Sequence, residues 1–251
     1  MIDLITLVTK ESKRFLRVWK QTLIPPVVTI VLYLLIFGKF IWDRISIIEW
    51  VDYINFIFPW LLMMSVIMAS YQNTSSSFFW SKFQHSIEEL FVSPISHTKI
   101  LLGFCIWAVL RAMLVWALVF IAWAIMADIE IYNYFYFIIF LLLSSILFAL
   151  LWLVNAIYAK TFDDISIIPS FVITPLIYLW WVFYSTELLS SFWHTISMVN
   201  PILYMVNWLR YSFLWISDVN IYIAIWILIF FIILLTIINF ILLKKWHWIK
   251  S

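Results

Sequence analysis

Two adjacent carboxylates, Glu88 and Glu89, lie in a short segment whose spacing favours one amphipathic helical turn. The apolar members of this turn fall at positions i, i+3 and i+4: Ile87, Leu90 and Phe91. They share one face of a helix, which leaves both acids on the other side. Pro94 predicts where the helix ends, because the residue before a proline is pushed out of the helical region. Such a helix suits docking to a soluble partner; the alternative is a solvated loop with a chance helical turn.

The sequence lacks the residue groupings that support catalysis. The four histidines are scattered through predicted loops and the C-terminal tail, without metal-ligand spacing: His85, His97, His194 and His247. Cys105, the single cysteine, lies in an apolar run and is best explained as a small buried hydrophobe. Two glycines cannot build a glycine-rich phosphate loop. We therefore expect no catalytic residue, metal or cofactor in this chain, and any ATP hydrolysis would belong to a separate chain.

The composition is that of an integral membrane protein. Hydrophobic residues make up 66% of the chain and charged residues 11%, whereas a soluble domain has about 25% charged residues. The mean hydropathy is +1.07, and several apolar runs reach the roughly 20 residues that a helix needs to cross a bilayer. The net charge of +2 gives no indication of a nucleic-acid partner. We predict an all-α membrane protein in contact with lipid.

The apolar runs predict one membrane domain, residues 1–251, with six spans. Their approximate bounds are 23–40, 56–71, 100–126, 134–158, 165–184 and 221–243. Residues 1–22 form an amphipathic, lysine- and arginine-rich helix that suits an anionic membrane surface, or else an ordinary basic flank of the first span. Pro25 and Pro26 would lie in the opening turn of that span, where missing N–H groups cost least. Residues 185–220 are too polar for a simple span and suggest short outer helices or a re-entrant element.

Six spans place both termini on one side of the membrane, and the basic residues indicate which side. One side carries eleven of them: Lys10, Lys13, Arg14, Arg17, Lys20, Lys82, Lys99, Lys160, Lys244, Lys245 and Lys250. The other side carries three: Lys39, Arg44 and Arg210. The positive-inside rule therefore places the termini in the cytoplasm. The polar stretch 78–99, which contains Glu88 and Glu89, would also be cytoplasmic, as would the turn 160–164.

Arg111 is the one strong charge inside a predicted span, where ionisable residues are costly and often functional. It can snorkel or pair with another subunit, or it can contact an anionic substrate. Asn155, Asp163 and Asp164 lie near the predicted inner surface. We interpret them as helix ends and docking elements rather than as a proton relay.

The tryptophan content is unusual. Tryptophan normally collects at membrane interfaces, yet several lie inside predicted spans: Trp107, Trp116, Trp152, Trp180 and Trp181. Average glycine usage of about 7% would give about 18 glycines here, and the two glycines and seventeen tryptophans together make nineteen. One hypothesis is that most of these tryptophans are UGA codons that the organism reads as glycine. The alternative is a genuinely tryptophan-rich membrane protein.

The sequence resembles the membrane subunits of ABC type-2 exporters over essentially its whole length. The resemblance is carried by FLRVWKQTLIPPVVTIVLYLLIFG, FPWLLMMSVI, SSFFWSKFQHSIEELFVSPIS, NAIYAKTFDDISIIPSFVITPLIYLWWVFYS and NPILYMVNWLRYSFL. It is most similar to the bacterial inner-membrane permeases for multidrug, polysaccharide and lipid export. Such relatives carry glycine where this chain has Trp60, Trp80, Trp152, Trp180, Trp181, Trp208 and Trp215. Trp19 and Trp193 look like true family tryptophans.

The resemblance implies an ABC-2 (type V exporter-like) fold that forms a homodimer and binds two cytoplasmic ABC ATP-binding subunits, which hold ATP-Mg. Residues 87–91 would be the coupling helix, with Glu88 and Glu89 at the rim of a cleft in the ATPase. Asp163 and Asp164 would belong to a second, smaller contact. Substrate would pass along the dimer interface, near the second and fifth spans, and residues 185–220 would cap the outer end of the pathway. The candidate pathway residues are Ser65, Tyr71, Arg111 and Tyr178.

The function expected from this resemblance is ATP-driven export of a lipid, glycan or hydrophobic drug-like molecule. A channel or secondary transporter that works without an ATPase is the main alternative, although it would usually show intramembrane acids or paired charges. A membrane-embedded enzyme is disfavoured, because no nucleophile and base lie at a common depth.

Overall fold

The computed structural model describes residues 2–33, 35–36, 47–48, 51–126, 131–178, 201–215, 217 and 220–245. Its helices are α1 (Ile2–Tyr33), α2 (Tyr53–Phe83), α3 (Ser86–Val92), α4 (His97–Met126), α5 (Tyr134–Tyr158), α6 (Phe162–Ile168), α7 (Thr174–Tyr178), α9 (Pro201–Leu214) and α10 (Ile221–Lys244). A π-helical segment, η2 (Pro169–Ile173), joins α6 to α7. Two strands, β1 (Ile47–Ile48) and β2 (Val51–Asp52), pair antiparallel. Apart from this short strand pair, the predicted all-α class is confirmed.

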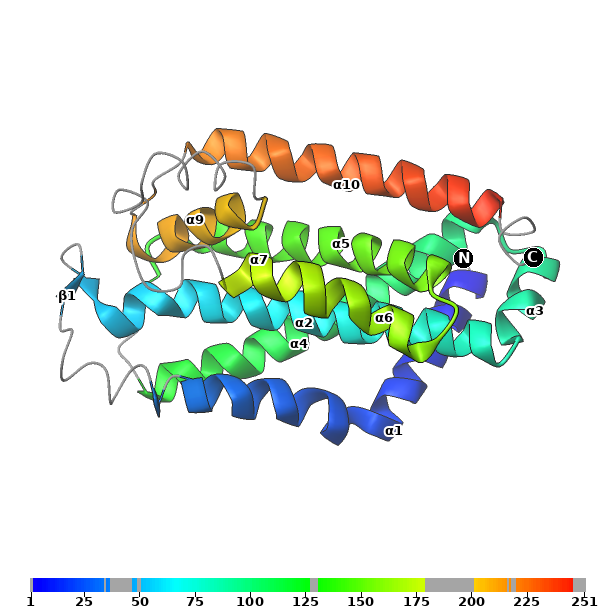
Figure 1. The fold of residues 1–251 in the computed structure, drawn as a ribbon, viewed down its shortest axis with the longest axis horizontal. Coiled ribbons are helices and arrows are strands. Elements are labelled where there is room, and N and C mark those ends of the chain that lie inside the picture. The colour runs from blue at the N-terminus through cyan, green and yellow to red at the C-terminus, as the bar shows by residue number, and fades with distance from the viewer. Residues whose placement is uncertain are drawn as a thin grey trace.

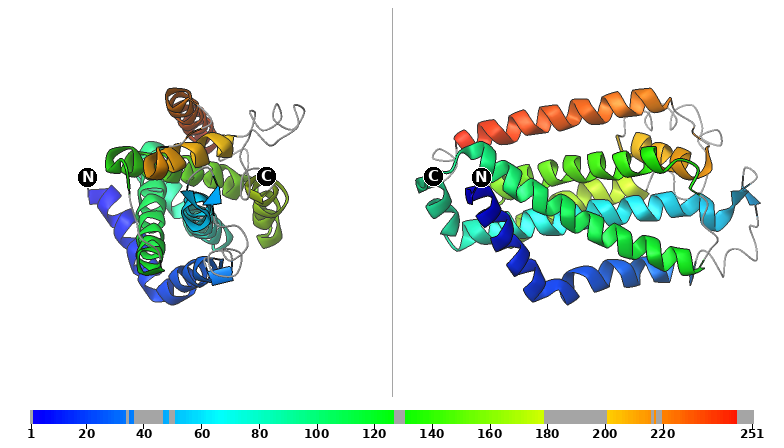
Figure 2. Two further views of the ribbon diagram at one scale, coloured as in Figure 1. Left: turned by 90° about the vertical axis from the view of Figure 1, so that its left-hand side faces the viewer. Right: turned by 180° about the vertical axis from the view of Figure 1, so that it is seen from behind.

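Helix α2 runs through the middle of an elongated bundle (Figure 1). It packs against α1, α4, α5 and α9, and its residues from Phe58 to Ile67 are almost entirely buried. Helix α10 lies along one side of the bundle against α5, and α1 lies against α4 on another (Figure 2). The start of α1, the end of α10, α3 and the turn between α5 and α6 are all at the same end of the bundle (Figure 1).

Four of the described helices are long and apolar enough to cross a membrane. They are Ile5–Tyr33, His97–Ile125, Tyr134–Tyr158 and Ile221–Lys244, and a shorter apolar helix covers Phe58–Tyr71. The shorter helix contains most of the predicted second span. The predicted fifth span begins in α6 and continues through η2 and α7, and its last residues, 179–184, lie outside the described part of the chain. The count of six spans therefore stays a prediction.

Helix α1 bends at Val18, whose φ of −120° and ψ of 17° are not helical. The hydroxyl of Thr22 donates to the carbonyls of Val18 and Trp19. A side chain that inserts into the backbone ladder in this way is a recognised cause of helix kinks. The first segment of α1 therefore turns away from the second (Figure 2). Pro25 and Pro26 lie inside the helix beyond this bend, so their expected place in an opening turn was wrong.

Helix α2 extends further than the sequence suggested. Residues 73–77, rich in serine, threonine and asparagine, separate the predicted second span from the polar stretch 78–99, and such residues favour turns. In the structure α2 continues without a break to Phe83. Phe78 and Phe79 are buried, as are Ser75 and Ser77. Packing against neighbouring helices outweighs the weak local preference, so the first part of the stretch 78–99 is core rather than surface.

A proline organises the contact between α2, α5 and α6. Pro169 has no N–H group, so the carbonyl of Ile165, four residues earlier, loses its usual helical donor. Two side chains take its place: Asn155 Nδ2 donates to this oxygen at 2.9 Å and the Tyr71 hydroxyl at 3.1 Å. Asn155 is buried and Tyr71 is half-buried. A buried carbonyl needs such partners, and here its partners come from two other helices.

This arrangement predicts a conditional effect of Tyr71→Phe. In the unmodified chain, loss of the hydroxyl should lower the free energy of unfolding in detergent by about 1 kcal/mol. In a Pro169→Ala background, the new N–H group can reach the Ile165 carbonyl, so the same change should cost much less. Thermal unfolding of the four variants measures the coupling. Equal losses in both backgrounds would contradict this role of Pro169.

Candidate functional site

The predicted amphipathic helix is present as α3 and is seven residues long. Ile87 is 1% exposed and joins the core, against which Leu90 and Phe91 pack while remaining partly exposed. The helix ends at Val92, and Ser93 is extended with a ψ of 157°, as expected for the residue before a proline. Three apolar side chains therefore hold α3 against the end of the bundle.

The two acids of α3 differ in their surroundings. The Glu88 carboxylate lies 2.9 Å from His85 Nδ1, in an ion pair that depends on protonation of the imidazole. His85 itself has a φ of 57°, in the left-handed region, where it ends α2 and starts α3. The Glu89 side chain is exposed. Glu89 is thus available to a partner at this surface, and Glu88 also fixes the turn that leads into α3.

The second predicted contact, the turn 160–164, is held by a capping box at the start of α6. Asp164 Oδ2 accepts from the backbone N–H groups of Lys160 and Thr161, both at 2.8 Å, and the Asp164 N–H donates to Thr161 Oγ1 at 3.2 Å. The bonds from Lys160 and Thr161 hold the pKa of the Asp164 carboxyl below its usual value. Asp163 is exposed. Asp164 therefore shapes the turn, and Asp163 can contact a partner.

The last turns of α2 join these two elements. Lys82 Nζ donates to the carbonyls of Ile157 and Ala159, both at 2.7 Å, at the C-terminal end of α5. The Phe162 ring lies edge-on to Phe79, with centroids 4.8 Å apart, and 5.3 Å from Phe83. Sequence reasoning missed the role of Lys82, because no local pattern shows which distant helix end a lysine will reach.

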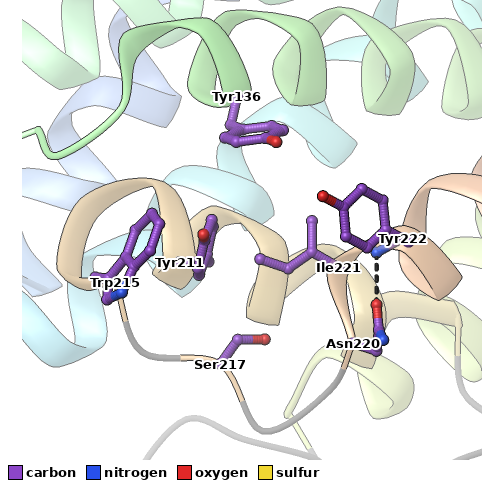
Figure 3. Close-up of a pocket in the computed structure, with 7 residues that line it drawn as sticks. All are labelled: Tyr136, Tyr211, Trp215, Ser217, Asn220, Ile221 and Tyr222. Carbon is purple, nitrogen blue, oxygen red and sulfur yellow. Dashed lines mark hydrogen bonds between the residues drawn. The ribbon is translucent and has the colours of Figure 1, made fainter.

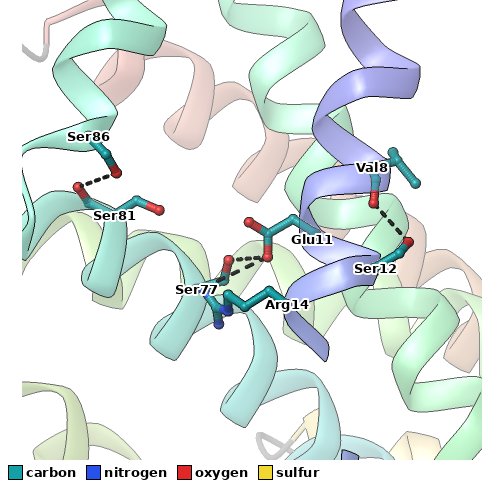
Figure 4. A network of polar contacts seen from close by, with 7 residues as sticks. All are labelled: Val8, Glu11, Ser12, Arg14, Ser77, Ser81 and Ser86. Carbon is teal, nitrogen blue, oxygen red and sulfur yellow. Dashed lines mark hydrogen bonds and ion pairs between the residues drawn. The ribbon is translucent and has the colours of Figure 1, made fainter. Parts of the chain in front are cut away.

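A second polar contact joins the first segment of α1 to α2 (Figure 4). Glu11 is 2% exposed and accepts a hydrogen bond from the Ser77 hydroxyl. Arg14 Nη1 lies 3.9 Å from the same carboxylate. A buried carboxylate needs such partners, so Glu11 fixes the amphipathic segment against α2. The signal for Glu11 in the sequence was weak, because it is one of two acids, with Asp3, within a basic helix.

The four candidate pathway residues belong to different helix contacts. The Ser65 hydroxyl, 3% exposed, donates within its own helix to a carbonyl one turn earlier, at 2.6 Å. The Tyr71 hydroxyl is bonded to α6. Arg111, also 3% exposed, has its guanidinium carbon 5.9 Å from the Phe15 ring of α1. Tyr178 is the last residue of α7. The pathway that these four residues were predicted to line stays a prediction.

A pocket of about 260 Å³ opens at the opposite end of the bundle from α3 (Figure 3). It lies between the start of α5, the end of α9 and the start of α10. Its lining is Tyr136, Tyr211, Trp215, Ser217, Asn220, Ile221 and Tyr222. The Asn220 side chain is already used, since its oxygen accepts from the Tyr222 N–H at 2.9 Å and caps α10. The tyrosines give the pocket aromatic faces and hydroxyl groups.

The capping box predicts a pH-dependent effect of Asp164→Ala. The folded-state pKa of Asp164 is lowered, so its ionised form stabilises the fold above the unfolded-state pKa of about 3.9. That contribution is lost as the pH falls through the folded-state value. The variant should therefore melt at a lower temperature than the parent at pH 7, and the difference should vanish in strong acid. A difference in melting temperature that is the same at every pH would contradict this assignment.

Known membrane transport proteins are similar to this chain over most of its length. The profile of the ABC-2 type transporter family matches residues 3–214. The inner membrane transport permease YadH of Escherichia coli K12 is 43% identical over 242 residues, which cover 96% of this chain and 94% of the relative. Proteins of the same name from Escherichia coli O157:H7 and Shigella flexneri match equally well. The chain belongs to the ABC-2 type transporter family and is a multi-pass transporter membrane subunit.

Proposed function

We propose that this chain is the permease subunit of an ATP-driven exporter, in which two copies pair with two cytoplasmic ABC ATP-binding subunits that hold ATP-Mg. The observation that carries the proposal is α3. It is a short helix whose Ile87 is anchored in the core and whose Glu89 is exposed at the end of the bundle. Members of this family generally pair with an ATP-binding subunit. Helix α3 is a short, anchored element that such a subunit can bind.

The distribution of charge supports a cytoplasmic position for this end of the bundle. The described lysines and arginines that were predicted to face the cytoplasm belong to the first segment of α1 and the residues just after its bend, the elements around α3, the turn 160–164 and the end of α10. Those elements gather at one end (Figure 1). Arg210 lies in α9, toward the other end. Under the positive-inside rule, the end that carries α3 faces the cytoplasm, with both termini.

The proposed mechanism transmits movement of the ATPase through α2. ATP-driven closure of the two motor subunits would displace α3, which follows α2 after a tight turn at His85. Helix α2 is 31 residues long and reaches the opposite end of the bundle. Displacement of one end of such a helix tilts it against α4 and α5, which is a rigid-body route between inward-open and outward-open states. The spans around α2 and α6–α7 would line the path of a lipid, glycan or hydrophobic drug-like molecule.

A channel or secondary transporter without an ATPase is the alternative function. Ion-coupled transport usually needs ionisable groups inside the membrane. Among the residues that the structure describes, Glu11 is the one buried carboxylate. It lies in the amphipathic segment of α1 and is bonded to Ser77. This position favours a structural role for Glu11 and the ATP-driven mechanism for the protein.

Charge reversal on α3 tests the proposed function. Glu88→Lys combined with Glu89→Lys should reduce co-purification of the ATP-binding subunit at least about tenfold, which corresponds to roughly 1.4 kcal/mol of binding free energy. Thr98→Lys, an exposed position in the same region but outside α3, is the matched control and should retain the subunit. The elution volume and melting temperature of both variants establish that the membrane domain is folded. Normal association of the double variant would contradict docking through α3.

A further inference from the structure

We propose that Lys82 is a positioning residue that makes α3 and the turn 160–164 move as one body; this inference rests on the proposed function. Lys82 lies four residues before Ser86, the first residue of α3. The carbonyls that it binds, those of Ile157 and Ala159, directly precede the turn. A single side chain thus joins the two elements that we assign to the ATPase.

The chemistry of a helix end explains why this bond is specific. The last four carbonyls of a helix have no partner within it and carry the negative end of the helix dipole. The lysine ammonium group supplies three donors and a positive charge. It reaches one of these carbonyls, that of Ile157, and also the carbonyl of Ala159, which directly follows α5, both at 2.7 Å. Burial lowers the pKa of the Lys82 ammonium group, the charge of Lys160 adds to this lowering, and the charge of Asp164 opposes it.

Aromatic packing holds the end of α2 against the start of α6, but it does not by itself fix the distance between α3 and the turn 160–164. The rings of Phe79 and Phe83 on α2 surround Phe162. Ring contacts tolerate sliding, since their attraction is spread over many weak atom pairs. Hydrogen bonds at 2.7 Å have a narrow range of length and direction. Loss of Lys82 should therefore loosen the link between α3 and the turn while leaving the hydrophobic packing in place.

Distance measurements between spin labels test this role. Labels at Val92→Cys on α3 and Ser166→Cys on α6 occupy exposed positions, and a Cys105→Ala background removes the native thiol. In the complex with the ATP-binding subunit, the distance between the labels should be the same without nucleotide and after trapping with ADP and vanadate. Lys82→Met keeps the length of the side chain but removes its donors, and it should broaden the distance distribution at least about twofold. Lys82→Arg retains the charge and donors and should restore a narrow distribution.

The outcomes separate this inference from the proposed function. Failure of the parent chain to bind any ATP-binding subunit would overturn the proposed function itself. Binding with a distance that changes between the two states would show that α3 and the turn move separately. A narrow, unchanged distribution in Lys82→Met would show that the aromatic contacts suffice without Lys82. Either of the last two results overturns the role of Lys82.

Several tryptophans occupy positions that suit glycine, and the first of them is Trp215 at the end of α9. Trp215 has a φ of 60° directly after the last residue of α9. Its N–H group donates to the Tyr211 carbonyl at 3.0 Å, which closes the end of the helix. The position after a helix is where glycine usually adopts this left-handed conformation, because a Cβ atom is strained there. A bulky aromatic residue is among the least suited to it.

Buried indole groups give independent evidence. Five tryptophans have a buried ring N–H without an acceptor among the described residues: Trp107, Trp116, Trp123, Trp152 and Trp208. Buried tryptophan normally finds a partner for this group, and a buried donor without one costs about 1–3 kcal/mol. Glycine at these positions would remove every one of these unsatisfied donors. Glycine also lets helices approach closely in this chain: at Gly103, where α1 meets α4, an added Cβ would overlap the Leu7 side chain.

We infer that position 215 and these five positions hold glycine in the working protein, because the host reads UGA as glycine. Trp19 provides the contrast. It is 44% exposed and carries Lys20 over its ring at 5.9 Å, which suits a residue at a membrane interface. The gene should therefore have UGA at the six positions and UGG at Trp19. UGG at the six positions would overturn the inference.

Peptide mass spectrometry of the protein from its own host reads the side chains directly. Peptides that cover the six positions should each lack the mass of an indolylmethyl group, and the peptide that contains Trp19 should retain it. In a host with the standard code, Trp215→Gly should raise the melting temperature, because it relieves the backbone at the end of α9. A native peptide with tryptophan at position 215, or a lower melting temperature of the glycine variant, would contradict the inference.

Discussion

The need to pair every buried backbone group governs the half of this structure that carries α3. Within a bilayer no water is available to replace a missing hydrogen bond. Pro169 frees the carbonyl of Ile165, and the end of α5 frees those of Ile157 and Ala159. The partners of these groups are Asn155, Tyr71 and Lys82. Because two of these partners belong to α2, the ends of α5 and α6 are fixed to α2.

Helix α2 consequently connects the parts on which the proposed function depends. It carries α3 at one end, holds the amphipathic segment of α1 through Ser77 and Glu11, and packs against α4 and α5 along its length. A push on α3 would reach α1 and α5 through the hydrogen bonds of Ser77 and Lys82, and α4 through side-chain packing. The bend of α1 at Val18 separates a first segment, which packs on α4 through Phe15 and bonds to α2 through Glu11, from a second segment whose Tyr33 contacts Trp60 of α2.

Patterns within a few residues predicted the local features well. The i, i+3, i+4 spacing and Pro94 located α3, and the long apolar runs located α5 and α10, whose helix bounds lie within a residue of the predicted ones. Polar composition was a weaker guide, since residues 73–77 continue α2 although serine, threonine and asparagine favour turns. Their burial against other helices decided the outcome, and a single sequence does not show which helices will meet.

The partners of the site also depend on the tertiary structure. Sequence composition counted Lys82 only as a cytoplasmic charge and gave no role to Glu11. Both act across helices, 75 or 77 residues from the carbonyls that Lys82 binds and 66 residues from Ser77. Asn155 was expected at a helix end, and its bond to the carbonyl opposite Pro169 follows only from the packing of α5 on α6. Local chemistry identified candidate groups, and the fold determined what each one contacts.

Purification of the tagged chain from its own host in mild detergent, with the mass of the intact complex as the readout, tests directly whether an ATPase drives this protein. We expect two copies of this chain together with two copies of an ATP-binding subunit that carries a phosphate-binding loop. A stable, folded preparation that contains this chain alone would contradict the ATP-driven mechanism and favour a channel or secondary transporter.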